Sequence, residues 1–347
     1  MNTNFATLLI DWFEENKREM PWRKTSNPYC IWVSEVMLQQ TQVATVIPYY
    51  IRFMERFPTV MDLAEATLED VHQYWQGLGY YRRGENLWKG AKVIAERWQG
   101  EFPRDPKLVS EIPGVGPYTL GAICSIAFHL PLPAVDGNVM RVMSRWYCLS
   151  DDIGVAKNRK IFEAKVMDNM PDDPNRFNQG LMELGALICT PQNPKCEECP
   201  VKSLCQAYQT GTVNDYPVKE KKLKKVEEKY YALMIEKDHK IGMIKRPEDG
   251  LLANLWGVPL IPEKKWQEAG FEQLDFIEFD SVNHIFTHKK WRMTPITVKW
   301  SKSLIECMNR AEINEDEIVY YDESKLKDIP IATAFKKVLK CVQIKLN

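Results

Sequence analysis

The sequence has 347 residues, 45% hydrophobic and 27% charged, with a formal net charge of −1. This composition indicates an ordinary globular protein of two or three domains. No apolar run reaches the length of a membrane span, and the acids in the first turns argue against a signal peptide. We therefore expect a soluble, cytoplasmic protein. The near-zero charge counts mildly against nucleic-acid binding, so such a function must rest on local features.

Residues 1–188 are predicted to form one helix after another. Phe5, Leu8, Leu9 and Trp12 form one apolar stripe at helical spacing, and similar stripes follow near residues 36–47 and 87–94. Glycine- and proline-containing breaks separate these segments at residues 57–60, 77–84, 112–119 and 132–138. Strand-like alternation is scarce, so this region is mostly α.

The pattern changes after a charged segment at residues 217–229, which we interpret as a linker; an exposed helix is the alternative. Residues 230–236 and 240–246 predict a β-hairpin. More strands are expected within 255–261, 284–300 and 317–321, and helices near 263–270 and 331–343. The second region is therefore a smaller α+β domain.

A glycine-containing turn is predicted at residues 110–129, SEIPGVGPYTLGAICSIAFH. Gly114 and Gly116 allow a tight turn, and the following helix should begin near Pro117. Uncovered amides at such a turn can hold a phosphate without lysine. A plain interhelical turn capped by glycines fits the residues equally well.

Two carboxylates occupy unusual sequence contexts. Asp136 follows an apolar run and opens a helix, so it suits an N-cap, yet it could also stabilise a developing cation. Glu35 lies among Trp32, Val33 and Val36, company that could raise its pKa and keep it protonated. From the residues alone, a solvent-facing or capping Glu35 is favoured.

Four cysteines are clustered, with six, two and five residues between successive members: Cys189, Cys196, Cys199 and Cys205. Such a cluster with one CxxC pair indicates metal binding, and disulfides are the poorest explanation. Zinc ribbons usually have two CxxC pairs, so the single pair favours a [4Fe–4S] cluster while zinc stays open. The other five cysteines are scattered, which suits a reducing compartment.

The order of these motifs resembles the helix-hairpin-helix base-excision DNA glycosylases that carry an iron–sulfur cluster, and most of all their MutY family of adenine DNA glycosylases. The resemblance lies in the segments WVSEVMLQQTQVATVIPYY, GLGYYRRGENL, IPGVGPYT, AVDGNVMRV and FNQGLMELGALIC, followed by the cysteine loop. It implies a helical glycosylase region at 1–216 with a [4Fe–4S] loop at 189–205. A linker at 217–229 and a MutT-like (Nudix-like) recognition domain at 230–347 complete the expected chain.

The resemblance also implies an activity: hydrolysis of the N-glycosidic bond of adenine mispaired with 8-oxoguanine or guanine in double-stranded DNA. The adenine must leave the stack. Glu35 would then act as general acid and Asp136 would stabilise the sugar cation, with Tyr118 and Asn138 supporting them. Endonuclease III-type enzymes have a nucleophilic Lys at the position of Tyr118, so we expect base release without strand cleavage.

Further DNA contacts follow from the same resemblance. Gln40 would wedge into the duplex, Tyr80 would intercalate beside the oxidised guanine, and Arg23 would line the adenine pocket. Thr41 and Leu78 would touch the orphan base. The remaining expected DNA-binding residues are Leu38, Gly114, Gly116 and the loop Phe286, Thr287 and His288, where the family usually has Ser at position 287.

Two other functions remain as alternatives. One is a bifunctional endonuclease III-like glycosylase and lyase, and the other is a non-catalytic DNA-binding module with a structural zinc. We expect a monomer, and no pyrophosphohydrolase activity because the second domain lacks the acidic Nudix-box pattern.

Overall fold

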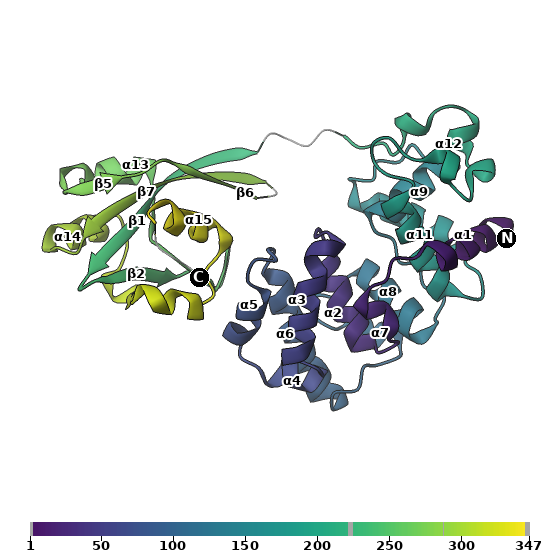
Figure 1. Cartoon of the computed structure of the whole chain (residues 1–347), viewed down its shortest axis with the longest axis horizontal. Helices are drawn as coiled ribbons and strands as arrows, with labels where there is room; N and C mark the ends of the chain where they lie inside the picture. Colours follow the sequence, from purple (N-terminus) through teal and green to yellow (C-terminus); the bar gives the residue numbers. More distant parts are fainter. Residues whose placement is uncertain (1–2, 221–224, 287, 344–347) are drawn as a thin grey trace. The chain divides into compact units, whose positions relative to one another are not determined.

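The computed structural model describes residues 3–220, 225–286 and 288–343, which form two compact units (Figure 1). The first unit comprises Met1–Ala66 and Asn86–Lys221 and is helical. The second comprises Thr67–Glu85 and Lys222–Asn347 and contains the β-sheet. None of the described helices combines the length and apolar character needed to cross a membrane.

The helical unit confirms the mostly α prediction for the N-terminal region. Its helices are α1 (Thr3–Asn16), α2 (Pro28–Leu38), α3 (Val43–Arg56), α4 (Val60–Glu65), α6 (Arg82–Trp98, which continues from the second unit), α7 (Pro106–Ser110), α8 (Pro117–Phe128), α9 (Gly137–Tyr147), α10 (Arg159–Met167), α11 (Pro174–Leu187) and α12 (Gln206–Gln209). Short 3-10 turns are η1 (Pro21–Lys24), η2 (Ala156–Asn158), η3 (Cys196–Glu198), η4 (Lys202–Leu204) and η5 (Val213–Asp215).

The main core of this unit lies between α1, α9, α10 and α11. Phe5 and Leu9 of the predicted apolar stripe are fully buried there, and Phe5 stacks on Trp146. A close contact between α8 and the backbone before Asp136 helps to position that carboxylate. A Cβ at Gly121 would lie 2.0 Å from the carbonyl oxygen of Pro133, so only glycine lets α8 lie directly against the chain that leads into Asp136.

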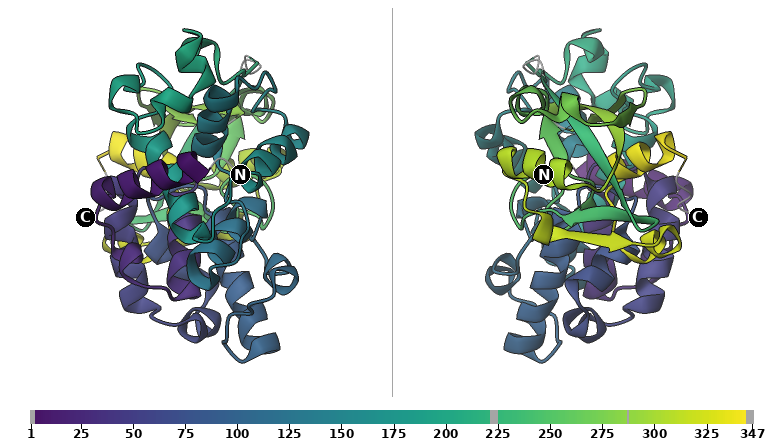
Figure 2. Two further views of the ribbon diagram at one scale, coloured as in Figure 1. Left: turned by 90° about the vertical axis from the view of Figure 1, so that its right-hand side faces the viewer. Right: turned by 90° about the vertical axis from the view of Figure 1, so that its left-hand side faces the viewer.

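The second unit is a mixed sheet with flanking helices, seen clearly in the right-hand view of Figure 2. Its strand order is β3-β2-β1-β7-β5. The elements are α5 (Leu68–Trp75), β1 (Val226–Lys237), β2 (Lys240–Lys245), β3 (Trp256–Gly257), β4 (Leu260–Pro262), α13 (Glu263–Glu268), η6 (Phe271–Gln273), β5 (Phe276–Glu278), β6 (Val282–Ile285), β7 (Lys289–Lys299), α14 (Lys302–Arg310), η7 (Glu315–Glu317), β8 (Ile318–Tyr321), η8 (Glu323–Asp328) and α15 (Thr333–Cys341).

The sheet topology confirms the predicted hairpin and the α+β class. Strands β1 and β2 pair antiparallel beside the turn at Lys237 and Lys240, whereas β1 and β7 run parallel from Val226 beside Lys289. Trp266 stacks on Phe271 in the hydrophobic core of this unit.

Parts of the predicted linker at 217–229 belong to the two units themselves. Val218 accepts a 3.1 Å hydrogen bond from the amide of Ile153, so residue 218 lies against the helical unit. Strand β1 already begins at Val226, inside the predicted linker. The division into 1–216, 217–229 and 230–347 stays a prediction; by contacts, residues 67–85 group with the second unit.

Candidate active site and cluster loop

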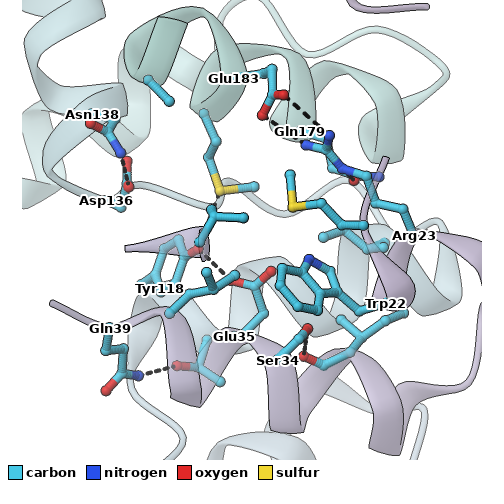
Figure 3. A pocket seen from close by; sticks show the side chains of 18 of the residues that line it. Trp22, Arg23, Ser34, Glu35, Gln39, Tyr118, Asp136, Asn138, Gln179 and Glu183 are labelled. Carbon is cyan, nitrogen blue, oxygen red and sulfur yellow. Dashed lines mark hydrogen bonds and ion pairs between the residues drawn. The ribbon is translucent and has the colours of Figure 1, made fainter. Parts of the chain in front are cut away.

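One cavity of the helical unit collects the catalytic and DNA-binding residues predicted for that unit (Figure 3). It is lined by side chains and backbone from η1, α2, the turn before α8, and the starts of α8 and α9, with α11 on the far wall. The predicted residues that line it are Arg23, Glu35, Leu38, Gln40, Thr41, Gly114, Gly116, Tyr118, Asp136 and Asn138.

Glu35 is buried on α2 and points into this cavity, where the Tyr118 hydroxyl hydrogen-bonds to its Oε2 (Figure 3). The solvent-facing alternative for Glu35 is therefore wrong. The pKa of this carboxyl is raised to about 7, mainly by burial and also by the nearby charge of Asp136, against the lowering effects of the Tyr118 hydrogen bond and of Arg23. A carboxyl with this pKa can donate a proton near neutral pH.

Asp136 both caps a helix and faces the cavity. Its Oδ1 accepts a 2.8 Å hydrogen bond from the amide of Val139, the N-cap geometry for α9. Its Oδ2 accepts a 2.8 Å hydrogen bond from Asn138 Nδ2. Burial raises the pKa of Asp136, and these hydrogen bonds oppose that rise. The capping alternative is thus correct, and it holds the carboxylate in a fixed orientation toward the cavity.

Arg23 is held on the other side of the cavity by an acid that sequence reasoning missed. Arg23 Nη2 lies 2.9 Å from Glu183 Oε2, and Arg18 Nε lies 2.8 Å from Glu183 Oε1. Although burial opposes ionisation of Glu183, the hydrogen bonds from Arg18 and Arg23 lower its pKa to about 2. Gln179 Oε1 accepts a 3.1 Å hydrogen bond from Arg23 Nε.

A local signal for this network was present. Gln179 and Glu183 stand four residues apart on α11, so their side chains share one face of the helix. Arg18 and Arg23, however, lie more than 150 positions earlier, and nothing local links them to that face.

The turn before α8 has the geometry predicted for it. Gly114 has φ 82°, in the left-handed region, and a Cβ there would lie 2.8 Å from Asn86 Cβ. Gly116 is the N-cap of α8, and a Cβ added there would meet nothing within 4 Å. Gln40 is exposed just after α2 with φ 58°, and Thr41 follows it.

The remaining predicted DNA-contact residues belong to the second unit. Tyr80 is 49% exposed with φ 48°, and the Arg83 guanidinium lies 5.3 Å from its ring centroid. Leu78 is buried. The ring of Phe286 packs edge-on against Trp291, and His288 is exposed, while Thr287 lies outside the described residues. Their roles stay predictions.

The four clustered cysteines surround a second cavity, next to Arg145 and Trp146 of α9. Four thiols around one shared space fit a [4Fe–4S] cluster. Burial raises the pKa of Cys199 to about 12, and coordination to a cation such as iron would favour the thiolate form of this buried side chain.

Arg141 connects this loop to the cavity. Its Nε donates to the Cys189 carbonyl oxygen at 2.7 Å, and its Nη2 donates to Asn138 Oδ1 at 2.9 Å. Asn138 in turn donates to Asp136, so one hydrogen-bonded chain runs from the cysteine loop to the carboxylate.

Comparison with known families agrees with this geometry. Residues 33–170 match the HhH-GPD superfamily of base excision DNA repair proteins, residues 189–205 match the iron-sulfur binding domain of endonuclease III, and residues 230–341 match the NUDIX domain. Among solved structures, a thermostable thymine-DNA glycosylase is similar, with 29% identity and a TM-score of 0.53 over 59% of this chain and 95% of that chain. A trapped endonuclease III–DNA covalent intermediate gives 26% identity and a TM-score of 0.52 over 61% of this chain and 99% of that one.

Curated relatives extend the match to both units. An adenine DNA glycosylase of Mus musculus is 36% identical, with 83% of this chain and 69% of the relative covered. One from Buchnera aphidicola (subsp. Schizaphis graminum) is 34% identical, with 96% and 97% covered. The cysteine loop accordingly binds a [4Fe–4S] cluster, and the chain belongs to the adenine DNA glycosylase family of base-excision repair enzymes.

Proposed function

We propose that this protein removes adenine mispaired with 8-oxoguanine or guanine from double-stranded DNA, by hydrolysis and without cutting the strand. The observation that carries the proposal is the arrangement in one cavity of a carboxyl with a pKa near 7 and a second, helix-capping carboxylate. This is the two-carboxylate logic of glycoside hydrolysis.

Glu35 performs the first chemical step. Once the adenine has left the stack, the protonated Glu35 donates its proton to adenine N7, which makes the purine a better leaving group. Tyr118 holds the Oε2 of Glu35, so the acid has a fixed direction toward the base. The C1′–N9 bond then breaks, and the bonding electrons leave with the base.

Asp136 acts on the sugar that remains. Cleavage leaves an oxocarbenium-like centre at C1′, and a negative carboxylate fixed by Val139 and Asn138 stabilises that charge without reorganising. Water then bonds to C1′ and releases a proton, leaving an intact strand with an abasic site.

Tyr118 supports the monofunctional chemistry. A lyase needs an amine that forms a Schiff base with the sugar. At that position this chain has a half-buried phenol, whose pKa lies well above its usual value through desolvation and the neighbouring Glu35. A phenol cannot form a Schiff base.

We assign recognition of the opposite base to Gln40, Thr41, Leu78, Tyr80 and the loop 286–288, with Arg23 on the adenine side. In this division, residues 1–216 carry out catalysis, residues 217–229 link the two domains, and residues 230–347 recognise the oxidised base. The protein acts as a monomer. Tyr80, at 49% exposed, has an accessible ring, which supports intercalation.

The test uses a labelled duplex with adenine opposite 8-oxoguanine, with each time point split between hot alkali and none, and an Asp136→Asn protein alongside. We expect cleavage at the adenine only after alkali, and none with Asp136→Asn, because asparagine keeps the cap but removes the charge. Cleavage without alkali, or a protein–DNA adduct trapped by borohydride, would indicate a lyase. Binding without base release would indicate a non-catalytic module.

A further inference from the structure

Arg145 is a buried cation beside the cysteine loop. It lies one helical turn after Arg141 on α9 and is 2% exposed. Its Nη1 lies 3.3 Å from Cys189 Sγ and donates to the carbonyl oxygen of Thr190 at 2.7 Å. Its Nε donates to the carbonyl oxygens of Val213 and Tyr216 at 3.1 and 3.0 Å.

Among the residues that the structure describes, no carboxylate forms an ion pair with this guanidinium. In the described part of the chain its hydrogen bonds go to main-chain oxygens and one sulfur, whereas Arg18 and Arg23 share the carboxylate of Glu183. A buried unpaired cation is unfavourable unless an anion joins it. Four thiolates around a [4Fe–4S]²⁺ core carry a net negative charge, and they lie on the side that Arg145 Nη1 faces.

We infer that Arg145 is the counter-charge of the cluster and raises its reduction potential through the N–H···S hydrogen bond to Cys189. A nearby positive charge stabilises the reduced, more negative form of the cluster over the oxidised one. The field acts at close range and away from water, so solvent screens it little.

Two other cations near the loop can be compared with Arg145. Lys202 lines the same cavity, but its side chain is 42% exposed and its Nζ lies 3.0 Å from Glu197 Oε2, so its charge is largely neutralised and screened. Arg141 is buried but donates to the carbonyl oxygen of Cys189 and not to its sulfur. Arg145 is therefore distinguished by its direct approach to a ligand sulfur.

The experiment compares holoproteins of wild type, Arg145→Gln, Arg145→Lys and Lys202→Gln, each checked for four irons and for visible absorption. Their [4Fe–4S]³⁺/²⁺ potentials are measured by voltammetry and by titration with ferricyanide, which accepts one electron from each cluster. We expect Arg145→Gln to shift to a more negative potential by several times the shift of Lys202→Gln. Arg145→Lys keeps the charge and should stay close to wild type.

If Arg145 only held the cysteine loop in place, the measurements would give a different result. An Arg145→Gln protein with a full cluster and the wild-type potential would overturn the inference, as would equal shifts in the Gln and Lys variants. If the Arg145→Gln protein does not retain its cluster, the rate of iron release to a chelator is compared between Arg145→Gln and Arg145→Lys instead. Retention by Arg145→Lys supports a counter-charge, and loss as fast as in Arg145→Gln contradicts it.

Discussion

At the scale of single residues, the protonation state of Glu35 should govern the rate. Its pKa of about 7 means that the fraction able to donate a proton falls as the pH rises through about 7. We expect the single-turnover rate of adenine release to fall tenfold per pH unit above that value. Glu35→Gln should lower the rate by about 10²–10⁴-fold and abolish this pH dependence. A wild-type rate that stays level between pH 6 and 9 would contradict the assignment of Glu35 as general acid.

The same carboxyl should link stability to pH. Its folded pKa, about 7, is raised above the ordinary 4.5, so the stability it contributes is fully present below about pH 4.5 and is lost as the pH rises through about 7. The loss should approach about 3 kcal/mol. Because Glu35→Gln cannot ionise, the difference in unfolding free energy between Glu35→Gln and wild type should grow in favour of the mutant from pH 5 to pH 8. Denaturant unfolding at the two pH values measures it, and a constant difference would refute the buried-acid account.

At the scale of elements, the approach of α11 to α9 sets the position of Asn138. A Cβ at Gly185 would lie 2.7 Å from Asn138 Cβ and 3.1 Å from its carbonyl oxygen. Gly185→Ala should therefore displace Asn138 and its partner Asp136, and slow base release roughly 10²-fold, as misplaced catalytic groups do. Single-turnover kinetics measure this, with visible absorption to verify the cluster.

Gly180→Ala is the matched control on the same helix. Its Cβ would meet the buried side chains of Leu9, at 3.2 Å from Cγ, and of Phe13, at 3.5 Å from Cβ, both on α1. We expect Gly180→Ala to change stability more than rate. If Gly180→Ala and Gly185→Ala release adenine at the same rate, α11 does not position the catalytic pair.

The turn before α8 offers a second test at this scale. Gly116 has φ −88° and open space where a Cβ would stand, so Gly116→Ala should leave the fold and melting temperature unchanged. If a DNA phosphate approaches this backbone, the added methyl blocks it and affinity should fall roughly tenfold, since a hydrogen bond to a charged group contributes about 1.5–3 kcal/mol. Fluorescence anisotropy with an uncleavable duplex measures the loss. Unchanged affinity would favour a plain interhelical turn.

Local signals explain which elements could be predicted from the sequence. Pro117 at the start of α8 and the Asp136 cap of α9 are short-range features, and both helices begin where these residues indicate. Strand β5 was missed because three residues of strand give weak periodicity. Helix α14 was also missed, although it is amphipathic with Leu304, Cys307 and Met308 buried on one face, so its spacing could have predicted it. The burial of Glu35 and the pairing of Arg23 with Glu183 depend on contacts between distant segments, which no local pattern encodes.

At the scale of the whole molecule, the predicted catalytic pair and only part of the predicted base reading belong to different compact units, since Gln40 and Thr41 share the helical unit with the catalytic pair. Glu35 and Asp136 lie in the helical unit, whereas Tyr80 and His288 lie in the unit built around the sheet. Deleting residues 222–347 would also remove the packing of 67–85, so point variants give a cleaner separation than truncation.

Tyr80→Ala and His288→Ala should each reduce the preference for adenine opposite 8-oxoguanine over adenine opposite guanine, by roughly 10-fold or more, the size of one or two lost specific contacts. The two carboxylates proposed to carry out hydrolysis belong to the helical unit and not to the unit of Tyr80 and His288, so the rate with the guanine mispair should change little. Asp136→Asn, in contrast, should slow both substrates by the same factor, because both pass through the same sugar cation. Single-turnover rates on the two duplexes supply the ratios. If Tyr80→Ala and His288→Ala slow both duplexes equally, reading of the oxidised base does not reside in the second unit.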